Sequence, residues 1–309
     1  MAELTTNLCA LELKNPVLAS SGTFAYGVEF AEQVDLNALG GIVVKGLSRE
    51  PIRGNPPPRV VETEGGMLNS IGLQNIGASA FVAQKLPDLA KLDTAVFANV
   101  FGYAPEDYVE VLRIFEDAEG LAGYELNVSC PNTKHGGMQF GSDPKLLSEV
   151  TGLARAAVKS SRPLMVKLSP NVGDIAAMAQ AAEEAGADAI SLINTLQALA
   201  VDARARRAKL GAGYGGLSGP AIKPIALRMV HQAALAVSIP VVGMGGVASG
   251  EDAAEMILCG ATAVQVGTAT FWDPQRPLKV AQELGRFLDR EGLASAVQLR
   301  GALQLTDED

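Results

Sequence analysis

The feature that most constrains the fold is a regular alternation of short apolar runs with longer helical patterns, which continues from one end of the chain to the other. The runs are rich in β-branched residues and short, which is typical of buried strands. Eight runs are predicted as strands: Val17–Ser20, Gly41–Lys45, Ala95–Val100, Tyr124–Val128, Leu164–Leu168, Ala189–Ile193, Pro240–Gly243 and Ala263–Val266. Strands that alternate with helices indicate a parallel sheet, because each parallel pair needs a crossover connection.

Helical patterns follow these strands, and two of them are preceded by residues typical of helix N-caps, Asp143 and Ser249. The predicted helices include Pro105–Asp117, Pro144–Lys159, Ile175–Ala185, Ala221–Ala236, Glu251–Leu258 and Leu278–Arg290. Eight strand units in 309 residues favour an α/β fold of the closed (β/α)8 TIM-barrel type. A doubly wound open sheet is the alternative, but no G-x-G-x-x-G motif follows the first strand.

Three segments are longer than ordinary connections, and long connections in compact domains are usually functional. Leu4–Asn15 is predicted to form an N-terminal hairpin that closes the bottom of the barrel. Leu47–Asn75 is predicted to contain a small hairpin around its paired glycines. Leu196–Gly219 carries a basic cluster, interpreted as a solvated face: Arg204, Arg206, Arg207 and Lys209. No shift in composition marks a boundary, so residues 1–309 are predicted to form one domain.

Composition limits the classes of partner and the compartment. The net charge of −9 argues against a nucleic-acid partner, whose binding relies on a basic surface. The N-terminus lacks the features of a signal peptide, and no apolar run is long enough to cross a bilayer. Three cysteines without C-x-x-C spacing fit a reducing cytoplasm, and two histidines are too few for a His-rich metal centre.

Polar residues or glycines occupy the C-terminal ends of all eight predicted strands. In a barrel these ends meet at one mouth, where active sites lie. A complete ring of such residues therefore predicts a ligand site. In chain order the ends are Ser20-Ser21, Lys45-Gly46, Asn99, Asn127, Lys167, Asn194-Thr195, Gly243 to Gly246, and Gly267-Thr268.

The residues of this ring fall into three chemical groups. The glycines of the last two strand ends expose backbone N–H groups suited to a phosphate, although tight turns would also explain them. Lys45 and Lys167 have no acidic partner nearby in sequence, so they need a ligand anion or a salt bridge to a distant residue. The amides of Asn69, Asn127 and Asn194 suit a planar ligand rich in amide groups.

A thiol follows the fourth strand. Asn127 lies near the end of the apolar run, and Cys130 comes next, before Pro131, which ends the strand ladder. The paired glycines at 136 and 137 allow the following segment to move. This arrangement suits a base that meets substrate and is then covered, and a buried structural cysteine is the alternative.

Five motifs occur in order along essentially the whole chain: N-S-I-G-L-Q-N (Asn69–Asn75), N-V-S-C-P-N-T-K-H-G-G (Asn127–Gly137), V-K-L-S-P-N (Val166–Asn171), G-G-L-S-G-P (Gly215–Pro220) and G-M-G-G-V (Gly243–Val247). Together they resemble the motifs of dihydroorotate dehydrogenase. The resemblance implies an FMN-dependent barrel that oxidises (S)-dihydroorotate to orotate in de novo pyrimidine (UMP) biosynthesis.

The resemblance also implies roles for individual residues. Cys130 would be the base that removes the C5 proton, and Lys167 would stabilise negative charge at the N1–O2 edge of the flavin. Lys45 would contact flavin and substrate. The other implied cofactor contacts are Ser21, Gly46, Asn99, Asn127, Ile193, Gly219, Gly245, Gly246, Gly267 and Thr268. The implied substrate contacts besides Lys45 are Asn69, Ser70, Ile71, Gly72, Leu73, Asn127, Asn194 and Thr195.

The wording of the motifs resembles class 1B of this family. The cysteine base and the lack of a membrane-binding extension distinguish the chain from the quinone-using class 2. Class 1B implies a heterotetramer with a partner subunit that carries FAD and a [2Fe–2S] cluster and passes electrons to NAD+. This chain has too few cysteines for that cluster. Three alternatives remain: a fumarate-using class 1A homodimer, a flavoprotein acting on tRNA uridines, which the acidic charge disfavours, and a non-catalytic phosphate-binding barrel.

Overall fold

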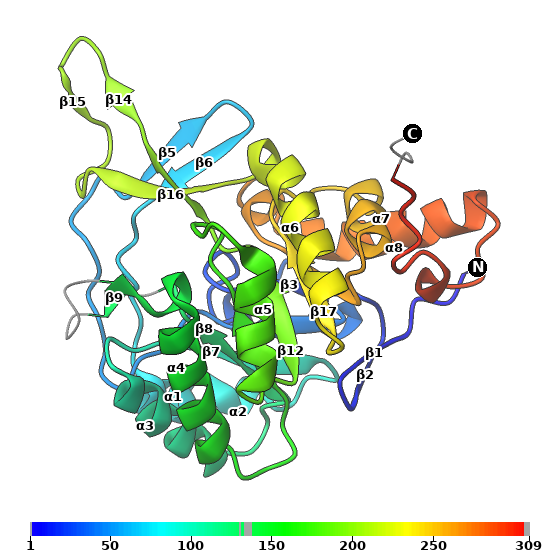
Figure 1. Ribbon diagram of the computed structural model, residues 1–309, viewed down its shortest axis with the longest axis horizontal. Coiled ribbons are helices and arrows are strands. Elements are labelled where there is room, and N and C mark those ends of the chain that lie inside the picture. The colour runs from blue at the N-terminus through cyan, green and yellow to red at the C-terminus, as the bar shows by residue number, and fades with distance from the viewer. Residues whose placement is uncertain (1, 130, 133–137, 306–309) are drawn as a thin grey trace.

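The computed structural model describes residues 2–129, 131–132 and 138–305 (Figure 1). Its centre is a closed barrel of eight parallel strands, and this confirms the predicted (β/α)8 architecture. In chain order, which is also the order around the barrel, the strands are β3 (Val17–Ala19), β4 (Gly41–Val43), β7 (Ala95–Val100), β8 (Gly123–Asn127), β11 (Leu164–Lys167), β12 (Ala189–Leu192), β17 (Val241–Met244) and β18 (Ala263–Val266). Each of the eight predicted strands is a barrel strand.

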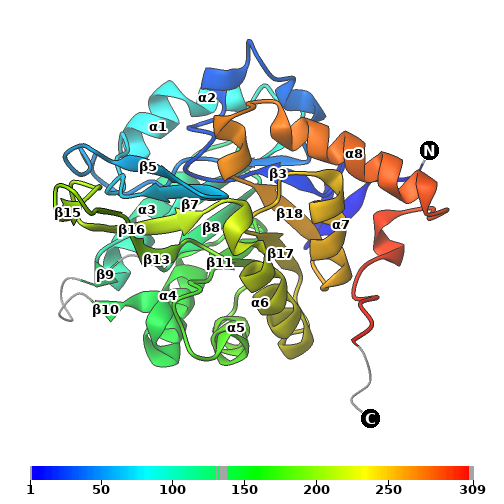
Figure 2. The same cartoon turned by 90° about the horizontal axis from the view of Figure 1, so that it is seen from above.

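Helices surround the barrel on its outside (Figures 1 and 2). The α-helices are α1 (Ala78–Gln84), α2 (Leu86–Leu89), α3 (Pro105–Glu116), α4 (Pro144–Ala157), α5 (Ile175–Glu184), α6 (Lys223–Ala236), α7 (Gly250–Leu258) and α8 (Arg276–Arg290). Both predicted caps form: Asp143 accepts hydrogen bonds from the first turn of α4, and Ser249 accepts one at the start of α7. None of the described helices is long and apolar enough to span a bilayer.

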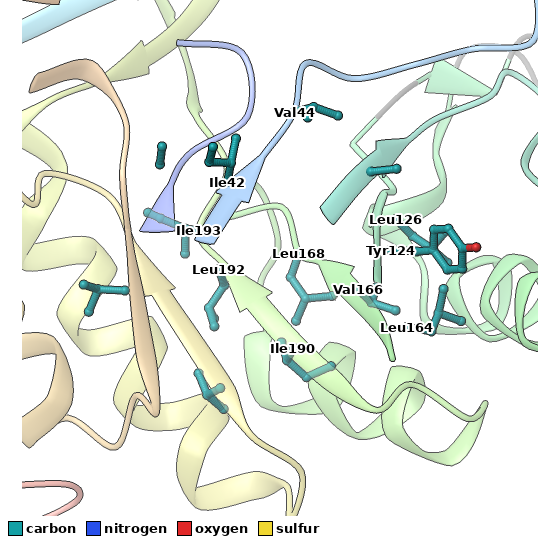
Figure 3. Packing of buried hydrophobic residues seen from close by; sticks show 14 of the residues in the cluster. Ile42, Val44, Tyr124, Leu126, Leu164, Val166, Leu168, Ile190, Leu192 and Ile193 are labelled. Atoms are coloured by element: carbon teal, nitrogen blue, oxygen red, sulfur yellow. The ribbon is translucent and has the colours of Figure 1, made fainter. Parts of the chain in front are cut away.

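Side chains of the barrel strands alternate between the helix layer and the barrel interior. Leu126 of β8 and Val166 of β11 face outward, and both are fully buried in the hydrophobic cluster beneath the helices (Figure 3). Burial of such a side chain stabilises the fold by roughly 1.5–3 kcal/mol. Intervening residues, such as Met165, belong to a separate cluster inside the barrel.

The predicted N-terminal hairpin closes one end of the barrel. Strands β1 (Thr6–Leu8) and β2 (Leu11–Leu13) pair antiparallel. Leu8 and Leu13 of the hairpin pack against the inner cluster, whose other buried members are Leu18, Val43, Phe97, Met165, Ala189, Val242 and Ala263. Because this end of the interior is apolar and filled, ligand access is limited to the opposite end of the barrel.

Two insertions combine into a second sheet, here called the cap sheet. It contains β5 (Val60–Thr63), β6 (Gly66–Asn69), β13 (Leu196–Leu199) and β16 (Tyr214–Ser218), with β6 paired to β16. The hairpin predicted within Leu47–Asn75 is β5–β6, whereas the strands within Leu196–Gly219 were not predicted. A hairpin of β14 (Val201–Asp202) and β15 (Arg207–Ala208) projects from the body and carries the exposed basic cluster (Figures 1 and 2).

Two short paired strands follow Cys130 in the chain. Strand β9 (Pro131–Asn132) pairs antiparallel with β10 (Met138–Gln139), and the 3-10 helix η4 (Phe140–Ser142) leads into α4. Further 3-10 turns are η1 (Val28–Phe30), η2 (Leu36–Ala38), η5 (Pro220–Ile222), η6 (Thr268–Phe271) and η7 (Ala296–Gln298).

Candidate active site

A cavity of about 680 Å³ lies between the C-terminal ends of the barrel strands and the cap sheet. This volume is typical of small-molecule sites. Every predicted site residue in the described part of the chain lines it: Ser21, Lys45, Gly46, Asn69, Ser70, Ile71, Gly72, Leu73, Asn99, Asn127, Lys167, Ile193, Asn194, Thr195, Gly219, Gly245, Gly246, Gly267 and Thr268. The predicted base, Cys130, lies outside the described residues.

Two lysines are the charged side chains among the described residues that line the cavity. Burial lowers the pKa of Lys45 because it removes water from the ammonium, and the nearby charge of Lys167 lowers it further. Lys45 makes no ion pair within the described part of the chain. The charge of Lys45 is therefore left for a bound ligand to balance, if that ligand carries a negative charge.

Lys167 has protein partners. Its Nζ donates to Ser21 Oγ at 3.1 Å and lies 3.7 Å from Glu125 Oε1. The salt-bridge alternative that the sequence left open for Lys167 is therefore confirmed. The partner was not visible in the sequence because Glu125 lies on β8, one strand away from Lys167 on β11.

Three polar side chains form a fixed group beside the cap sheet. The Nδ2 atom of Asn194 donates to Ser129 Oγ at 3.0 Å and to Asn127 Oδ1 at 3.3 Å, and its Oδ1 accepts from the Thr195 N–H at 2.8 Å. These bonds fix the orientation of both amides. Ser129 also lines the cavity and is not among the predicted site residues. Its place next to Cys130 in the N-V-S-C motif is a signal that could have identified it.

A buried polar cluster forms the floor of the cavity. Glu125 is fully buried and accepts hydrogen bonds from Asn99 Nδ2 at 2.6 Å, Ser191 Oγ at 2.9 Å and Gln265 Nε2 at 2.7 Å. Asn99 and Gln265 also line the cavity above it. Glu125, Ser191 and Gln265 are not among the predicted site residues. The available signal was a single polar residue between two apolar ones in Y-E-L, I-S-L and V-Q-V.

The turn after β17 can be built only with glycine. Gly245 and Gly246 have φ values of +118° and +85°. A Cβ at Gly246 would lie 2.6 Å from the Cβ of Lys223, and one at Gly245 would lie 2.8 Å from the Cβ of Ala226. On the other side of this turn, Thr268 Oγ1 donates to Ser218 Oγ of the cap sheet at 2.8 Å. Such a glycine turn lets a ligand approach the backbone closely, as phosphate sites require.

Comparison with known proteins agrees with the motifs. Residues 3–288 match the family model described as Dihydroorotate dehydrogenase. A protein of Solibacter usitatus, provisionally named dihydroorotate dehydrogenase A (fumarate), is 68% identical over 302 residues, which cover 98% of this chain and 99% of the relative. The catalytic subunits of dihydroorotate dehydrogenase B (NAD(+)) from Pelobacter propionicus and a Geobacter species are 53% and 50% identical, again over 98% of this chain and 99% of each relative. The chain is therefore an enzyme of the dihydroorotate dehydrogenase family.

Proposed function

We propose that residues 1–309 act as one FMN-binding barrel domain that oxidises (S)-dihydroorotate to orotate in pyrimidine biosynthesis. The observation that carries this proposal is the convergence of all described flavin and substrate candidates on one cavity, in a chain of this family. Most of these residues lie at the ends of different barrel strands or in the cap sheet, so independent segments contribute to the same site.

The donor set of the cavity fits FMN. Lysine ammonium groups suit the electron-rich edge of a flavin pyrimidine ring, and amide and hydroxyl groups suit its carbonyl and N–H groups. At Gly46 a Cβ would lie 2.8 Å from Asn99 Oδ1, so no larger residue fits between the β4 end and that amide. The turn at Gly245-Gly246 suits the phosphate. Ser21, Gly46, Asn99, Ile193 and Gly219 would hold the rest of the cofactor.

When bound, FMN supplies the acceptor for the hydride that leaves C6 of dihydroorotate. The part of the protein is to hold the pyrimidine and to take the proton from C5, so that the C5=C6 double bond of orotate forms. We assign the removal of this proton to the thiolate of Cys130. At neutral pH a thiolate is a far stronger base than the hydroxyl of a serine at the same position would be. The amides of Asn69, Asn127 and Asn194, with Thr195, would hold the pyrimidine and its carboxylate.

We further propose that the electrons pass to NAD+ through a partner subunit that carries FAD and a [2Fe–2S] cluster. Relatives that are 50–53% identical are named catalytic subunits of the NAD(+) type, a name that implies a separate subunit. The chain contains three cysteines, one fewer than the four thiolates that such a cluster takes. Fumarate is a second candidate acceptor, because the 68% identical relative carries the fumarate name.

An anaerobic experiment tests the substrate and the acceptor separately. The purified chain, reconstituted with FMN, should lose its flavin absorbance when (S)-dihydroorotate is added. Persistent absorbance at saturating dihydroorotate would reject the proposed oxidation. The reduced protein is then mixed with fumarate, with NAD+, or with NAD+ and the coexpressed iron–sulfur flavoprotein. Rapid reoxidation by fumarate alone would assign the fumarate type, whereas NAD+ reduction only with the partner would support the NAD+ type.

A further inference from the structure

We propose that Glu125 is a positioning residue that lowers the reduction potential of the bound flavin by balancing the charge of Lys167. This inference rests on the proposed FMN function. Glu125 does not line the cavity, and the mechanism above does not use it. It is nevertheless a fully buried carboxylate one layer below the site.

The register of the barrel explains why one carboxylate can contact four strands besides its own. Asn99 lies directly opposite Glu125 on the neighbouring strand, and Lys167 lies opposite Asn127, two residues beyond Glu125. Ser191 and Gln265 reach the same point from β12 and β18. The carboxylate therefore lies near the barrel axis, below the cavity, and is held by donors from β7, β12 and β18 as well as by the ammonium on β11.

The contacts of Glu125 are those of an ionised carboxylate. Both oxygens are acceptors: Oε1 receives the amide of Asn99, and Oε2 receives the hydroxyl of Ser191 and the amide of Gln265. The ammonium of Lys167 is 3.7 Å from Oε1. A buried charge is costly unless it is paired and hydrogen-bonded, and Glu125 has both kinds of partner.

The charges at the floor of the cavity determine the direction of the effect. Lys45 and Lys167 carry two positive charges, and Glu125 carries one negative charge. Reduction adds electrons to a flavin, so nearby positive charge favours the reduced form and nearby negative charge opposes it. Glu125 thus cancels part of the field of Lys167. Its removal would leave the charges of Lys45 and Lys167 unbalanced at the floor of the cavity, which would raise the potential of a flavin bound there.

E125Q removes the charge with little change of shape. Asn99 can still donate to the remaining carbonyl oxygen, and Ser191 can rotate its hydroxyl to accept from the new amide. Gln265 Oε1 is buried without a hydrogen-bond partner among the described residues. A half-turn of the Gln265 amide brings this free acceptor to the new NH2 group, so the hydrogen bonds of the cluster can all be kept.

E116Q is the matched control. Glu116 also lies 3.7 Å from a cation, Arg162, and accepts hydrogen bonds from Tyr124 Oη, Ser160 and Lys159. Burial opposes its ionisation, but these hydrogen bonds lower the pKa of Glu116 to about 2. It ends α3 and lies near the start of β8, at the opposite end of the barrel from the cavity. The same change of charge there should lower the melting temperature without altering the flavin potential.

The experiment is a redox titration of the FMN-loaded wild type, E125Q and E116Q against a dye of known potential. We expect E125Q to raise the midpoint potential by at least about 30 mV, which corresponds to a tenfold change in the ratio of affinities for reduced and oxidised FMN. The potential of E116Q should equal that of the wild type. An unchanged or lower potential in FMN-loaded E125Q, or an equal rise in E116Q, would overturn the inference.

E125Q leaves the buried charge of Lys167 without a partner, which destabilises the fold. A second comparison is used if this prevents E125Q from folding. The double variant K167Q/E125Q is then titrated, because it removes both charges and leaves neither ion unpaired. If Glu125 offsets Lys167 in the wild type, the potential of the double variant should stay within about 30 mV of the wild type, and a larger fall would refute the inference. If the wild type itself binds no FMN by absorbance and fluorescence, the proposed function fails, which is a different result from FMN binding with no shift.

Discussion

The substitution Lys45→Met should stabilise the apoprotein and at the same time weaken the binding of FMN. Lys45 lies half-buried at the end of β4, and the described residues offer no acidic partner to its ammonium. Lys167, its cationic neighbour, is balanced by Glu125. Lys45 therefore carries the uncompensated charge of the cavity, and methionine replaces it with an apolar side chain of similar length.

The loss of this unpaired charge sets the expected changes in the stability of the apoprotein and in its affinity for FMN. Burying an unpaired ion costs several kcal/mol, and the partial exposure of Lys45 reduces this to about 1–2 kcal/mol. The apoprotein of K45M should then melt about 1.5–3 °C higher. A lost charge-assisted hydrogen bond costs about 1.5–3 kcal/mol, so FMN should bind roughly 10- to 100-fold more weakly. At an FMN concentration 100 times the wild-type Kd, FMN stabilises the wild type by about 2.7 kcal/mol but K45M by only about 0.4–1.4 kcal/mol.

The pH dependence has a defined sign. Burial lowers the pKa of Lys45 in the folded protein, so the unfolded chain binds more protons as the pH approaches the ordinary lysine range. Stability of the apoprotein should therefore gain a contribution as the pH rises through the folded pKa of Lys45, and K45M should lack this contribution.

Thermal unfolding with and without FMN, from pH 7 to 10, measures all three effects. Lys209→Met on the exposed β14–β15 hairpin is the control, and it should match the wild type in each. The reasoning is refuted if K45M lowers the melting temperature of the apoprotein, or if FMN stabilises K45M as strongly as the wild type.

Three further substitutions test other parts of the site. Cys130→Ser should retain FMN but slow anaerobic flavin reduction by dihydroorotate about 10²- to 10⁴-fold at pH 7, and undiminished reduction would remove Cys130 from its role. Gly246→Ala places a Cβ 2.6 Å from that of Lys223 at positive φ, so it should cost about 1–3 kcal/mol and lower FMN content, as absorbance after desalting reports. Asn194→Ala breaks the bonds to Ser129 and Asn127 and should raise the Kd for orotate about tenfold by flavin spectral titration, with FMN content unchanged.

Local patterns were enough to predict the barrel. Its strands are short apolar runs bounded by turns, and each is buried on both sides, so tertiary context reinforces the local preference. The ring of polar strand ends follows from the same topology, since all parallel strands end at one mouth. The inward–outward alternation of side chains along each strand could also have predicted which polar residues face the barrel interior. Met165 faces inward, so Lys167 does too, and the same step of two leads from Phe97 to Asn99 and from Ala263 to Gln265.

The β5–β6 hairpin of the cap sheet was predicted, but β13 and β16 could not be predicted in this way, because these strands depend on distant partners. The segment that forms β16 is rich in glycine, which weakens a strand on its own. Glycine is required there for packing: a Cβ at Gly216 would lie 2.1 Å from Thr195 Oγ1, and one at Gly215 would lie 2.6 Å from the carbonyl oxygen of Asn69. The Glu125–Lys167 pair was missed for a related reason, since the register between strands, and not spacing along the chain, brings these charges together.

The pairing of β6 with β16 also has a consequence for how the protein is made. Asn69 and Gly216, which pair across these strands, are 147 residues apart. At a synthesis rate of about 5–20 residues per second, the edge of β6 waits roughly 7–30 s before its partner leaves the ribosome. During that time the β5–β6 hairpin has an unpaired edge, which is a site for association with other nascent chains. The mouth of the cavity is therefore among the last parts of the molecule to form, and the nascent chain acquires its ligand site only after most of the barrel has been synthesised.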